Sequence, residues 1–433
     1  MPKITIPNQI IRALWLLEKE GFPAYIVGGS LRDALLGNQP HDWDITTPAL
    51  PDKMLDIFTA AGYTTIPTGI AHGTVTVLID HTPIECTTYR IDGEYTDARH
   101  PDEVRFTDRI ADDLARRDFT VNAMACRLPH IAKWSGTEPA FSCGVTVSVD
   151  ELEIVDLYGG REDLRRGIIR CVGDPSTRLT EDALRILRGI RFCVQLGFAP
   201  DPATEQALLD CRDGLAHISV ERIATELIRT LESPGPCADG LLLMSRTRLW
   251  KYVLPEIENG NISKYFKSQK MLFHSVDRLP CDATKRIALL LCGAGEIGAK
   301  AACRRLKLSN RLTEAVTAYV GAIDRPCPAT EPETRRYMAE LEEYAEGALF
   351  IAAACHADEK EAYEAALKRV AVIRARGDCL AICDLAVDGQ TLMHELGLRG
   401  REVGEMLAKL LDVVLEDETK NEKEILLQIA GGM

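Results

Sequence analysis

The chain has 433 residues, a formal net charge of −14 at pH 7 and 46% hydrophobic residues. This length exceeds one ordinary hydrophobic core, so two to four domains are expected, and the hydrophobic content excludes wholesale disorder. So negative a charge argues against a protein that coats nucleic acid indiscriminately, because phosphate binding needs a positive surface. It does not exclude a local basic groove.

The first twenty residues predict an amphipathic helix rather than a secretion signal. Ile10, Ile11, Leu14 and Leu17 recur at helical spacing, and no basic stretch precedes a long apolar run. Elsewhere the longest apolar stretches, such as residues 287–292, fall far short of the roughly 20 residues that a membrane span needs. We therefore expect a soluble, cytoplasmic protein.

The fourteen cysteines are scattered singly, which is typical of reduced, buried thiols rather than of a disulfide scaffold. Only Cys379 and Cys383 lie close together in the sequence. Their spacing is not that of zinc ligands and fits one face of a helix, so we expect no metal there.

Up to about residue 145 the pattern mixes strands and helices. Residues 73–79 alternate in the manner of a strand with one buried face. A turn over residues 80–83 leads into a second strand, which places Glu85 opposite Ile84 and Cys86. We expect this half to be α/β.

From about residue 150 onward, apolar residues recur at three and four positions, which predicts helices. Residues 403–414 give the clearest stripe. A further helix is expected near the C-terminus, with Asn421 as its cap and Glu424 completing a capping box. Between the two halves, residues 127–151 predict a long loop or hairpin.

A glycine pair, Gly28 and Gly29, follows an apolar strand and precedes a short helix. Ser30 is expected to cap this helix and Gly37 to end it. Backbone N–H groups at such a turn can approach phosphate closely. Alone the pattern is weak, since it is also a common structural turn.

Two aspartates, Asp42 and Asp44, come next. If residues 41–45 form a strand, both carboxylates face one cavity, while Trp43 and Ile45 enter a core. Such a pair suits Mg²⁺, which prefers oxygen ligands and retains sites for substrate phosphates. A lone pair at this spacing is nevertheless more often a surface or turn feature.

Residues 181–194 predict a helix with a buried stripe at positions 184, 187, 190 and 194. Asp182 and Arg185 then lie one turn apart. A carboxylate offers only acceptors and a guanidinium only donors, so together they can satisfy the Watson–Crick edge of a base. A simple salt bridge on a solvated helix is the alternative.

Four motifs occur in the same order as in the class II tRNA nucleotidyltransferases and bacterial poly(A) polymerases. They are Gly-Gly-Ser-x-Arg-Asp with Asp-x-Asp, then RRDFTVNA at residues 116–123, DLYGG at 156–160 and EDALR at 181–185. The chain therefore resembles this family. The resemblance implies an α/β head with a DNA polymerase β-like nucleotidyltransferase sheet, followed by all-α neck, body and tail domains.

On this resemblance we divide the chain into a head over 1–145, a base-recognition neck over 146–235, a body over 236–310 and a tRNA-binding tail over 311–433. The body contains a segment like the start of an HD phosphohydrolase domain that includes His274. Cysteine and glycine at 292–293 replace the His-Asp pair of that domain, so we expect no phosphohydrolase activity.

The resemblance also implies a role for each site residue. Asp42 and Asp44 would bind two Mg²⁺ ions. Glu85 is a candidate third carboxylate, although an ordinary solvent-facing glutamate is an equal alternative. Gly29 and Arg32 would contact the triphosphate of the nucleotide.

The remaining implied roles concern the sugar and the base. Arg117 would contact the nucleotide and help select its ribose. Asp182 and Arg185 would pair with the incoming cytosine or adenine, and Arg188 and Arg191 would support the base and the phosphates.

The implied activity is the addition of C, C and A to the tRNA 3′ end from CTP and ATP, with no membrane or identifiable protein partner. Alternatives are a poly(A) polymerase, a partial CC-adding or A-adding enzyme, and a catalytically retired RNA-binding protein. Full CCA addition is favoured because residues 89–101 resemble the flexible loop of complete CCA enzymes. The basic C-terminal extension and basic insert typical of the bacterial polymerases are not found.

Overall fold

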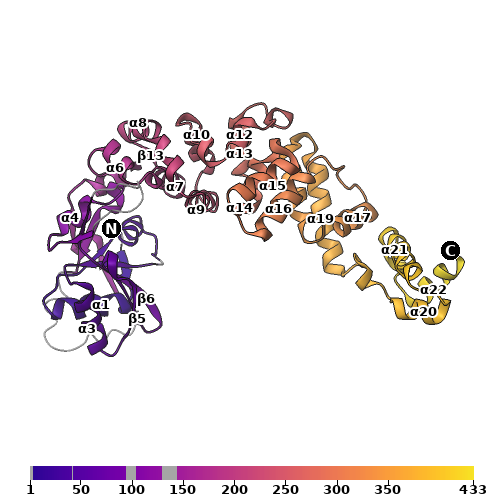
Figure 1. Cartoon of the computed structure of the whole chain (residues 1–433), viewed down its shortest axis with the longest axis horizontal. Coiled ribbons are helices and arrows are strands. Elements are labelled where there is room, and N and C mark those ends of the chain that lie inside the picture. The colour runs from indigo at the N-terminus through magenta and orange to yellow at the C-terminus, as the bar shows by residue number, and fades with distance from the viewer. Residues whose placement is uncertain (1–2, 41, 94–103, 129–143) are drawn as a thin grey trace. The chain divides into compact units, whose positions relative to one another are not determined.

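The computed structural model describes residues 3–40, 42–93, 104–128 and 144–433. The strands lie in the N-terminal half, coloured indigo to magenta in Figure 1, and the rest of the chain is helical. This confirms the predicted fold class, an α/β head followed by helical domains. Among these described residues, no helix is long and apolar enough to cross a membrane.

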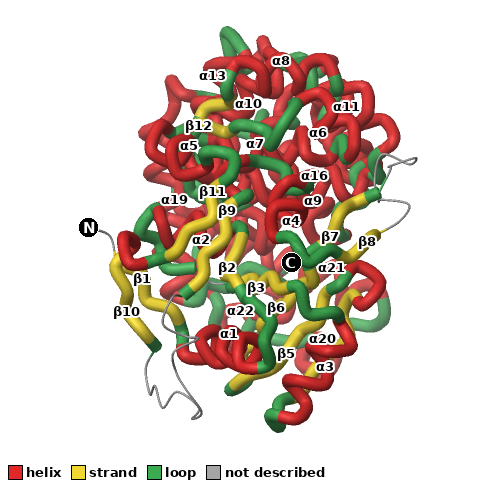
Figure 2. Tube along the Cα trace, turned by 90° about the vertical axis from the view of Figure 1, so that its left-hand side faces the viewer, coloured by secondary structure: helices red, strands yellow, loops and turns green. Residues whose placement is uncertain are grey.

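A seven-stranded mixed sheet forms the centre of the N-terminal part. Its strands are β2 (Tyr25–Val27), β3 (Asp44–Thr47), β4 (Thr64–Gly69), β5 (Thr74–Ile79), β6 (Thr82–Thr88), β9 (Met124–Arg127) and β11 (Glu153–Asp156). They are arranged in the order β11-β9-β2-β3-β6-β5-β4. Only β3 and β6 are parallel neighbours, and Figure 2 shows β2, β3, β6 and β5 side by side.

Three two-stranded ladders accompany the sheet. They pair β1 (Lys3–Ile6) with β10 (Val145–Ser148), β7 (Arg90–Asp92) with β8 (Val104–Phe106), and β12 (Ile168–Ile169) with β13 (Ala199–Pro200). The ladder of β7 and β8 flanks the predicted flexible loop, of which residues 94–101 lie outside the described residues.

The sheet extends beyond the predicted head boundary at residue 145. Strand β11 pairs with β9, and β10 lies in the stretch predicted to be a loop, whose residues 129–143 are outside the described residues. The expectation that residues 146 onward form only helices was wrong here. Strands of four residues are too short for their alternation to stand out beside the helical pattern that follows.

The hairpin predicted around residue 80 is confirmed. Its buried side chains are Val75, Val77 and Ile79 on β5 and Ile84 and Cys86 on β6. The turn is shorter than expected, because Ile79 already pairs with Thr82. Asp80 and His81 make the turn with φ angles of 48° and 64°, the left-handed values of a tight two-residue hairpin.

Helices complete this part of the chain, and the first three of them contact the sheet. They are α1 (Asn8–Lys19), α2 (Gly29–Leu35), α3 (Pro51–Ala60), α4 (Ile110–Ala115), α5 (Gly160–Arg166), α6 (Pro175–Glu181), α7 (Leu184–Leu196), α8 (Pro202–Asp210) and α9 (Val220–Leu231). Helix α1 confirms the predicted N-terminal helix, and its four predicted apolar residues are all buried. Helices α1 and α3 contact each other, and both contact β6.

The chain forms two compact units, one of residues 1–230 with 243–252 and the other of residues 231–242 with 253–433. The helices from residue 237 onward are α10 (Cys237–Arg246), α11 (Trp250–Val253), α12 (Glu256–Asn259), α13 (Gln269–Val276), α14 (Ala283–Leu290), α15 (Gly295–Arg305), α16 (Asn310–Gly321), α17 (Glu331–Leu341), α18 (Ala345–Cys355), α19 (Lys360–Arg376), α20 (Gly389–Leu396), α21 (Arg401–Glu416) and α22 (Lys423–Gly432). The division into four domains stays a prediction.

The last three helices share a small apolar core. Leu410 and Val414 of α21 are fully buried in it, which supports the predicted stripe. The predicted cap of α22 was wrong. The Asn421 side chain instead accepts the Ala386 N–H at 2.8 Å and donates to the Asp384 carbonyl at 3.1 Å. The side-chain amide of Asn421 thus bonds to an earlier loop instead of the first turn of α22.

The predicted helix through Cys379 and Cys383 was also wrong. Helix α19 ends at Gly377, whose φ of 75° closes the helix in the left-handed region. Cys379 is buried in the loop that follows, and Cys383 is exposed in a 3₁₀ turn over residues 382–384. The cysteines of the described ranges are free thiols.

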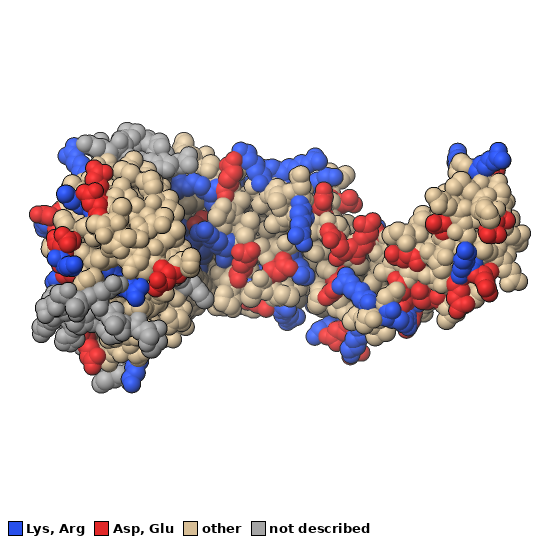
Figure 3. All heavy atoms as spheres, turned by 90° about the horizontal axis from the view of Figure 1, so that it is seen from below, with Lys and Arg blue, Asp and Glu red and all other residues tan. Residues whose placement is uncertain are grey.

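On the face seen in Figure 3, lysine and arginine side chains are interspersed with aspartates and glutamates. This visible face does not carry a single sign of charge, in keeping with the net charge of −14. A concentration of arginines lies inside a cavity of the N-terminal unit.

Candidate active site

A cavity of about 520 Å³ in the N-terminal unit brings together eight of the predicted site residues. These are Gly29, Arg32, Asp44, Arg117, Asp182, Arg185, Arg188 and Arg191. Asp42 and Glu85 are not among the lining residues. The cavity is also lined by residues to which the sequence gave no individual role: Gly28, Arg116, Asp118, Asn122, Leu184, Phe192, Gln195 and Arg222.

The glycine turn forms one wall of the cavity. Gly28 precedes α2 with a φ of 76°, and a Cβ atom there would lie 3.1 Å from the Arg117 guanidinium. The predicted Ser30 cap was wrong, because Ser30 lies within the helix and its hydroxyl donates to the Val27 carbonyl at 3.1 Å. Gly37, with a φ of 82°, follows the helix as predicted.

The two aspartates lie at the start of β3 rather than inside it. The strand begins at Asp44, Asp42 precedes it in a bend, and residue 41 is outside the described residues. Trp43 and Ile45 are buried as predicted, at 7% and 0% exposure. The alternation therefore holds, although the regular strand is shorter than expected.

Glu85 lies directly beside Asp44, because β3 and β6 pair these two residues in register. Asp44 reaches solvent, yet the surrounding protein partly desolvates it and raises its pKa. Glu85 and Asp42 raise the pKa further, while Arg117 lowers it. The carboxylates thus carry more negative charge than the neighbouring arginine neutralises.

This donor set fits Mg²⁺, which prefers carboxylate oxygens and keeps positions for water and substrate phosphates. No group of three or more His, Cys, Asp or Glu side chains in the described part of the chain is arranged to enclose a metal by itself.

Asp118, which also lines the cavity, accepts several hydrogen bonds. Its Oδ2 accepts two hydrogen bonds from Arg188, at 2.9 and 2.7 Å, and its Oδ1 accepts from the Phe119 N–H at 2.8 Å and from Asn122 at 3.2 Å. Burial alone would raise the pKa of Asp118, but the Arg188 charge and these hydrogen bonds hold the pKa well below its usual value.

Asp113 holds the arginine pair of the RRDFTVNA motif. This fully buried carboxylate accepts from Arg116 at 2.9 and 2.7 Å and from Arg117 at 3.2 Å. Arg32, from α2, donates to Asn122 at 2.8 Å and to Asp33 at 2.7 Å. The cavity arginines are therefore fixed by hydrogen bonds from the protein.

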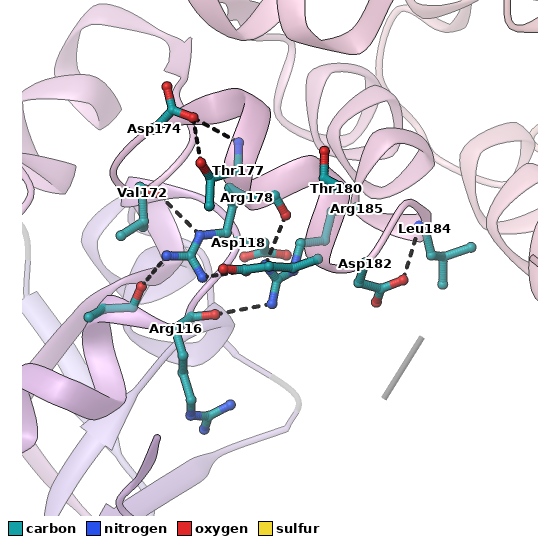
Figure 4. Close-up of polar contacts among 12 residues, drawn as sticks. Arg116, Asp118, Val172, Asp174, Thr177, Arg178, Thr180, Asp182, Leu184 and Arg185 are labelled. Carbon is teal, nitrogen blue, oxygen red and sulfur yellow. Dashed lines mark hydrogen bonds and ion pairs between the residues drawn. The ribbon is translucent and has the colours of Figure 1, made fainter. Parts of the chain in front are cut away.

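The predicted helix through residue 182 is broken there. Helix α6 ends at Glu181, and Asp182 is extended and accepts the Leu184 N–H at 3.0 Å (Figure 4). The Arg185 N–H still donates to the Asp182 carbonyl at 2.9 Å, so the two residues remain one turn apart. A side chain of this type competes with the helix by bonding the backbone two residues ahead.

The side chains of Asp182 and Arg185 each have polar partners elsewhere in the N-terminal unit. Arg185 donates to Glu181 at 2.5 Å and to the Arg116 carbonyl at 3.2 Å. Asp182 accepts from Arg222 of α9 at 3.3 Å. Both residues line the cavity, and Figure 4 shows Arg185 beside Arg116.

Helix α7 presents its polar residues to the cavity and buries the predicted apolar stripe. Leu184, Leu187, Ile190 and Val194 are all at most 7% exposed. Arg191 pairs with Glu226 of α9 at 2.8 Å. Sequence spacing on a helix could have indicated Phe192 and Gln195, but no local signal places Arg222 at the same cavity.

The C-terminal unit contains the segment predicted to resemble an HD phosphohydrolase domain and the predicted tRNA-binding tail. His274 of α13 is exposed, and its Nδ1 lies 2.7 Å from the Lys270 carbonyl. Ser309 caps α16, because its side chain accepts the Leu312 N–H at 3.3 Å. Gly400, with a φ of 56°, precedes α21 in the predicted tRNA-binding tail.

A glycine turn, the carboxylate of Asp44 and a group of arginines line this cavity, an arrangement that indicates a nucleotidyltransferase. Three family models match the chain accordingly. They are the Poly A polymerase head domain over residues 24–170, the RNA and SrmB-binding site of polymerase A over 197–260, and tRNA nucleotidyltransferase domain 2 over 281–430.

Relatives that match nearly the whole chain are CCA-adding enzymes. The CCA-adding enzyme of Geobacillus stearothermophilus is 35% identical over 415 residues, which cover 94% of this chain and 92% of that protein. The Lactococcus lactis subsp. cremoris CCA-adding enzyme is 34% identical over 433 residues, covering 98% and 96%. The crystal structure of the Bacillus stearothermophilus CCA-adding enzyme in complex with CTP matches with a TM-score of 0.74 and 30% identity, covering 98% and 96%. The chain belongs to the family of CCA-adding tRNA nucleotidyltransferases.

Proposed function

We propose that this protein adds C, C and A to the 3′ end of tRNA, without a nucleic-acid template, from CTP and ATP. The convergence of eight predicted residues in one cavity carries this proposal. The similarity to a CCA-adding enzyme in complex with CTP along nearly the whole chain supports it. The tRNA would enter with its 3′-hydroxyl directed toward the carboxylates.

The phosphate end of the nucleotide would lie against the glycine turn and Arg32. Gly28 lacks a side chain where a Cβ atom would crowd Arg117, so the backbone and the guanidinium stay close together. Arg32 is held by Asn122 and Asp33 and needs no large movement to meet a phosphate. Preorganised donors of this kind cost little reorganisation when charge develops.

Asp42 and Asp44 would hold two Mg²⁺ ions, with Glu85 as a third carboxylate. When bound there, Mg²⁺ supplies a lowered pKa for the attacking 3′-hydroxyl and stabilisation of the leaving pyrophosphate. Asp44 lines the cavity, and the neighbouring charges of Glu85 and Asp42 raise its pKa. No side chain has to form a covalent intermediate.

Asp182 and Arg185 would recognise the base. The break before α7 turns the Asp182 carboxylate toward the cavity, and three partners, namely Glu181 and the carbonyls of Arg178 and Arg116, fix the direction of Arg185. A carboxylate and a guanidinium then offer acceptors and donors to the Watson–Crick edge. Specific recognition can thus come from the protein alone.

The other arginines would hold the rest of the nucleotide. Arg117, fixed by Asp113, would contact the ribose, and its Nε has no hydrogen-bond partner among the described residues. Arg188 and Arg191 would support the base and the phosphates. We further propose that the neck, body and tail divide at residues 235 and 310, and that the tail binds tRNA in the cytoplasm.

A direct experiment tests this proposal. Purified protein is incubated with a tRNA that lacks its 3′ end, Mg²⁺ and CTP, ATP or both, and the products are sized. We expect three added nucleotides ending in A when both are present. A long A tail would identify a poly(A) polymerase, two added C residues or a single A would identify a partial enzyme, and tRNA binding without incorporation would identify a retired enzyme.

A further inference from the structure

Three arginines of the cavity share one aromatic ring. The guanidinium carbons of Arg191, Arg32 and Arg188 lie 4.8, 5.2 and 5.5 Å from the centre of the Phe192 ring. The ring itself is 5% exposed and lines the cavity. On another side, Phe119 packs edge-on against it, with ring centres 5.8 Å apart.

These arginines come from two elements that are distant in the sequence. Arg32 belongs to α2, beside the glycine turn, whereas Arg188 and Arg191 belong to α7 with Phe192 itself. Each has its own polar partner: Asn122 for Arg32, Asp118 for Arg188 and Glu226 for Arg191. The Phe192 ring is therefore the contact that these three cations share.

Contact with the Phe192 ring offsets part of the repulsion among the three guanidinium groups. Guanidinium groups repel one another, and the negative face of an aromatic ring attracts each of them. Such an attraction is worth about 0.5–1 kcal/mol at exposed sites and about 2 kcal/mol when desolvated. A ring at 5% exposure is close to the desolvated case.

We propose that Phe192 is a positioning residue for the incoming nucleotide, because its ring holds Arg32, Arg188 and Arg191 in one array that meets the triphosphate and the base together. The proposal rests on the proposed function of the cavity. Phe192 touches no reacting atom and acts through the three guanidinium groups. It joins the phosphate end, on α2, to the base-recognition helix α7.

Fluorination of the ring tests this role without changing its shape much. Phenylalanine at position 192 is replaced by its monofluoro, difluoro and trifluoro analogues, which progressively remove the negative charge of the ring face. We expect the KM for CTP and for ATP to rise with each fluorine, reaching about threefold to about thirtyfold in the trifluoro protein. The kcat and the unfolding temperature should change much less.

A matched series separates this effect from packing. Phe58 of α3 is fully buried in the core beside the sheet and does not line the cavity, so the same analogues at position 58 should leave both KM values unchanged. Phe192→Leu, which keeps an apolar side chain but has no ring, should raise KM at least as much as the trifluoro analogue.

The outcomes distinguish this proposal from the function on which it rests. If the unmodified protein adds no nucleotide to tRNA, the proposed function fails. If it adds CCA but the KM values stay flat across the fluorine series, the positioning role of Phe192 is overturned. A fall in unfolding temperature at flat KM would likewise assign Phe192 to packing alone.

Discussion

Two carboxylates that line the cavity, Asp44 and Asp118, have pKa values that are shifted in opposite directions. At the sheet end, Asp44 lies beside Glu85 and near Asp42, and these negative charges and partial desolvation raise its pKa. At the helical end, Asp118 accepts two hydrogen bonds from Arg188, which outweigh its burial and hold its pKa low. In the proposed function, Mg²⁺ would complete the sheet end, whereas Arg188 already pairs with Asp118 at the helical end.

This difference supports separate roles for the two ends in the proposed reaction. The helical end is assembled before substrate arrives, so it can select a nucleotide by the fixed directions of its donors and acceptors. On the proposed function, the sheet end would gain its chemistry only when Mg²⁺ supplies positive charge and the triphosphate supplies further ligands to the ion. Substitutions at the two ends should therefore fail in different ways.

The largest effect is expected at the sheet end. Asp44→Asn keeps the shape of the side chain but removes a charge needed to hold Mg²⁺, so incorporation should fall at least about a thousandfold, a loss of about 4 kcal/mol in transition-state stabilisation. Binding of tRNA, measured by filter retention, should remain close to that of the parent protein. Activity above a tenth of the parent value would contradict the metal assignment.

At the helical end, Asp118→Asn should chiefly cost stability. It removes the charged acceptor of Arg188, and hydrogen bonds to charged groups contribute about 2 kcal/mol each to unfolding free energy. Urea unfolding measures the loss. Asp174→Asn is the matched control, because Asp174 caps α6 at the surface and asparagine caps a helix about as well, so little change is expected. Equal losses in both variants would argue that Asp118 has no special role.

Base selection should respond to Asp182→Ala. This change removes one half of the proposed pair that reads the Watson–Crick edge, and a good bidentate contact discriminates between bases by about 1–3 kcal/mol. The preference for CTP over UTP, taken as a ratio of kcat/KM values, should fall about tenfold before turnover is lost. An unchanged ratio would rule out the proposed role of Asp182 in base recognition.

The smallest effect concerns pH. The pKa of Asp118 is lowered on folding, so its contribution to stability is present above the unfolded value near about 3.9 and is lost as pH falls below it. The pKa of Asp44 is raised, so without Mg²⁺ its contribution is lost as pH increases above about 4. The free energy of unfolding, measured with urea at a series of pH values, should therefore fall less steeply toward acid pH in Asp118→Asn than in the parent protein. In Asp44→Asn it should decline less steeply than in the parent above about pH 4. If the free energy of unfolding changes with pH in the same way in both variants and the parent, the opposite pKa shifts of Asp44 and Asp118 are contradicted.

Much of this site could be predicted from the sequence, because its motifs are local and occur in a recognisable order. The glycine turn, the aspartates at and just before the start of β3 and the arginines of α7 each lie within a short stretch, and residue spacing carries their geometry. Of the cavity residues that were missed, Arg116, Asp118 and Asn122 lie within the RRDFTVNA motif and Phe192 and Gln195 lie on α7, whereas Arg222 comes from a distant element. Arg222 reaches Asp182 from α9, and nothing in its local sequence marks it.

The local errors have a common physical cause, namely competition for a polar side chain. Ser30 was expected to cap α2, but its hydroxyl bonds the Val27 carbonyl instead. Asn421 was expected to cap α22, but it bridges the loop at Asp384 and Ala386. Asp182 breaks a helix that the apolar stripe suggested was continuous, since its carboxylate bonds the Leu184 N–H. Hydrophobic periodicity reports the buried face and leaves such bonds undetermined.

The most direct test of the account follows single turnovers on tRNA that lacks its 3′ end, with CTP, ATP and Mg²⁺, and identifies the products by mass. We predict the ordered addition of C, C and A by the parent protein, and unextended tRNA that is still bound by the Asp44→Asn variant. Efficient extension by that variant, or extension by the parent that does not end after C, C and A, would contradict the central claim that this cavity performs metal-dependent CCA addition.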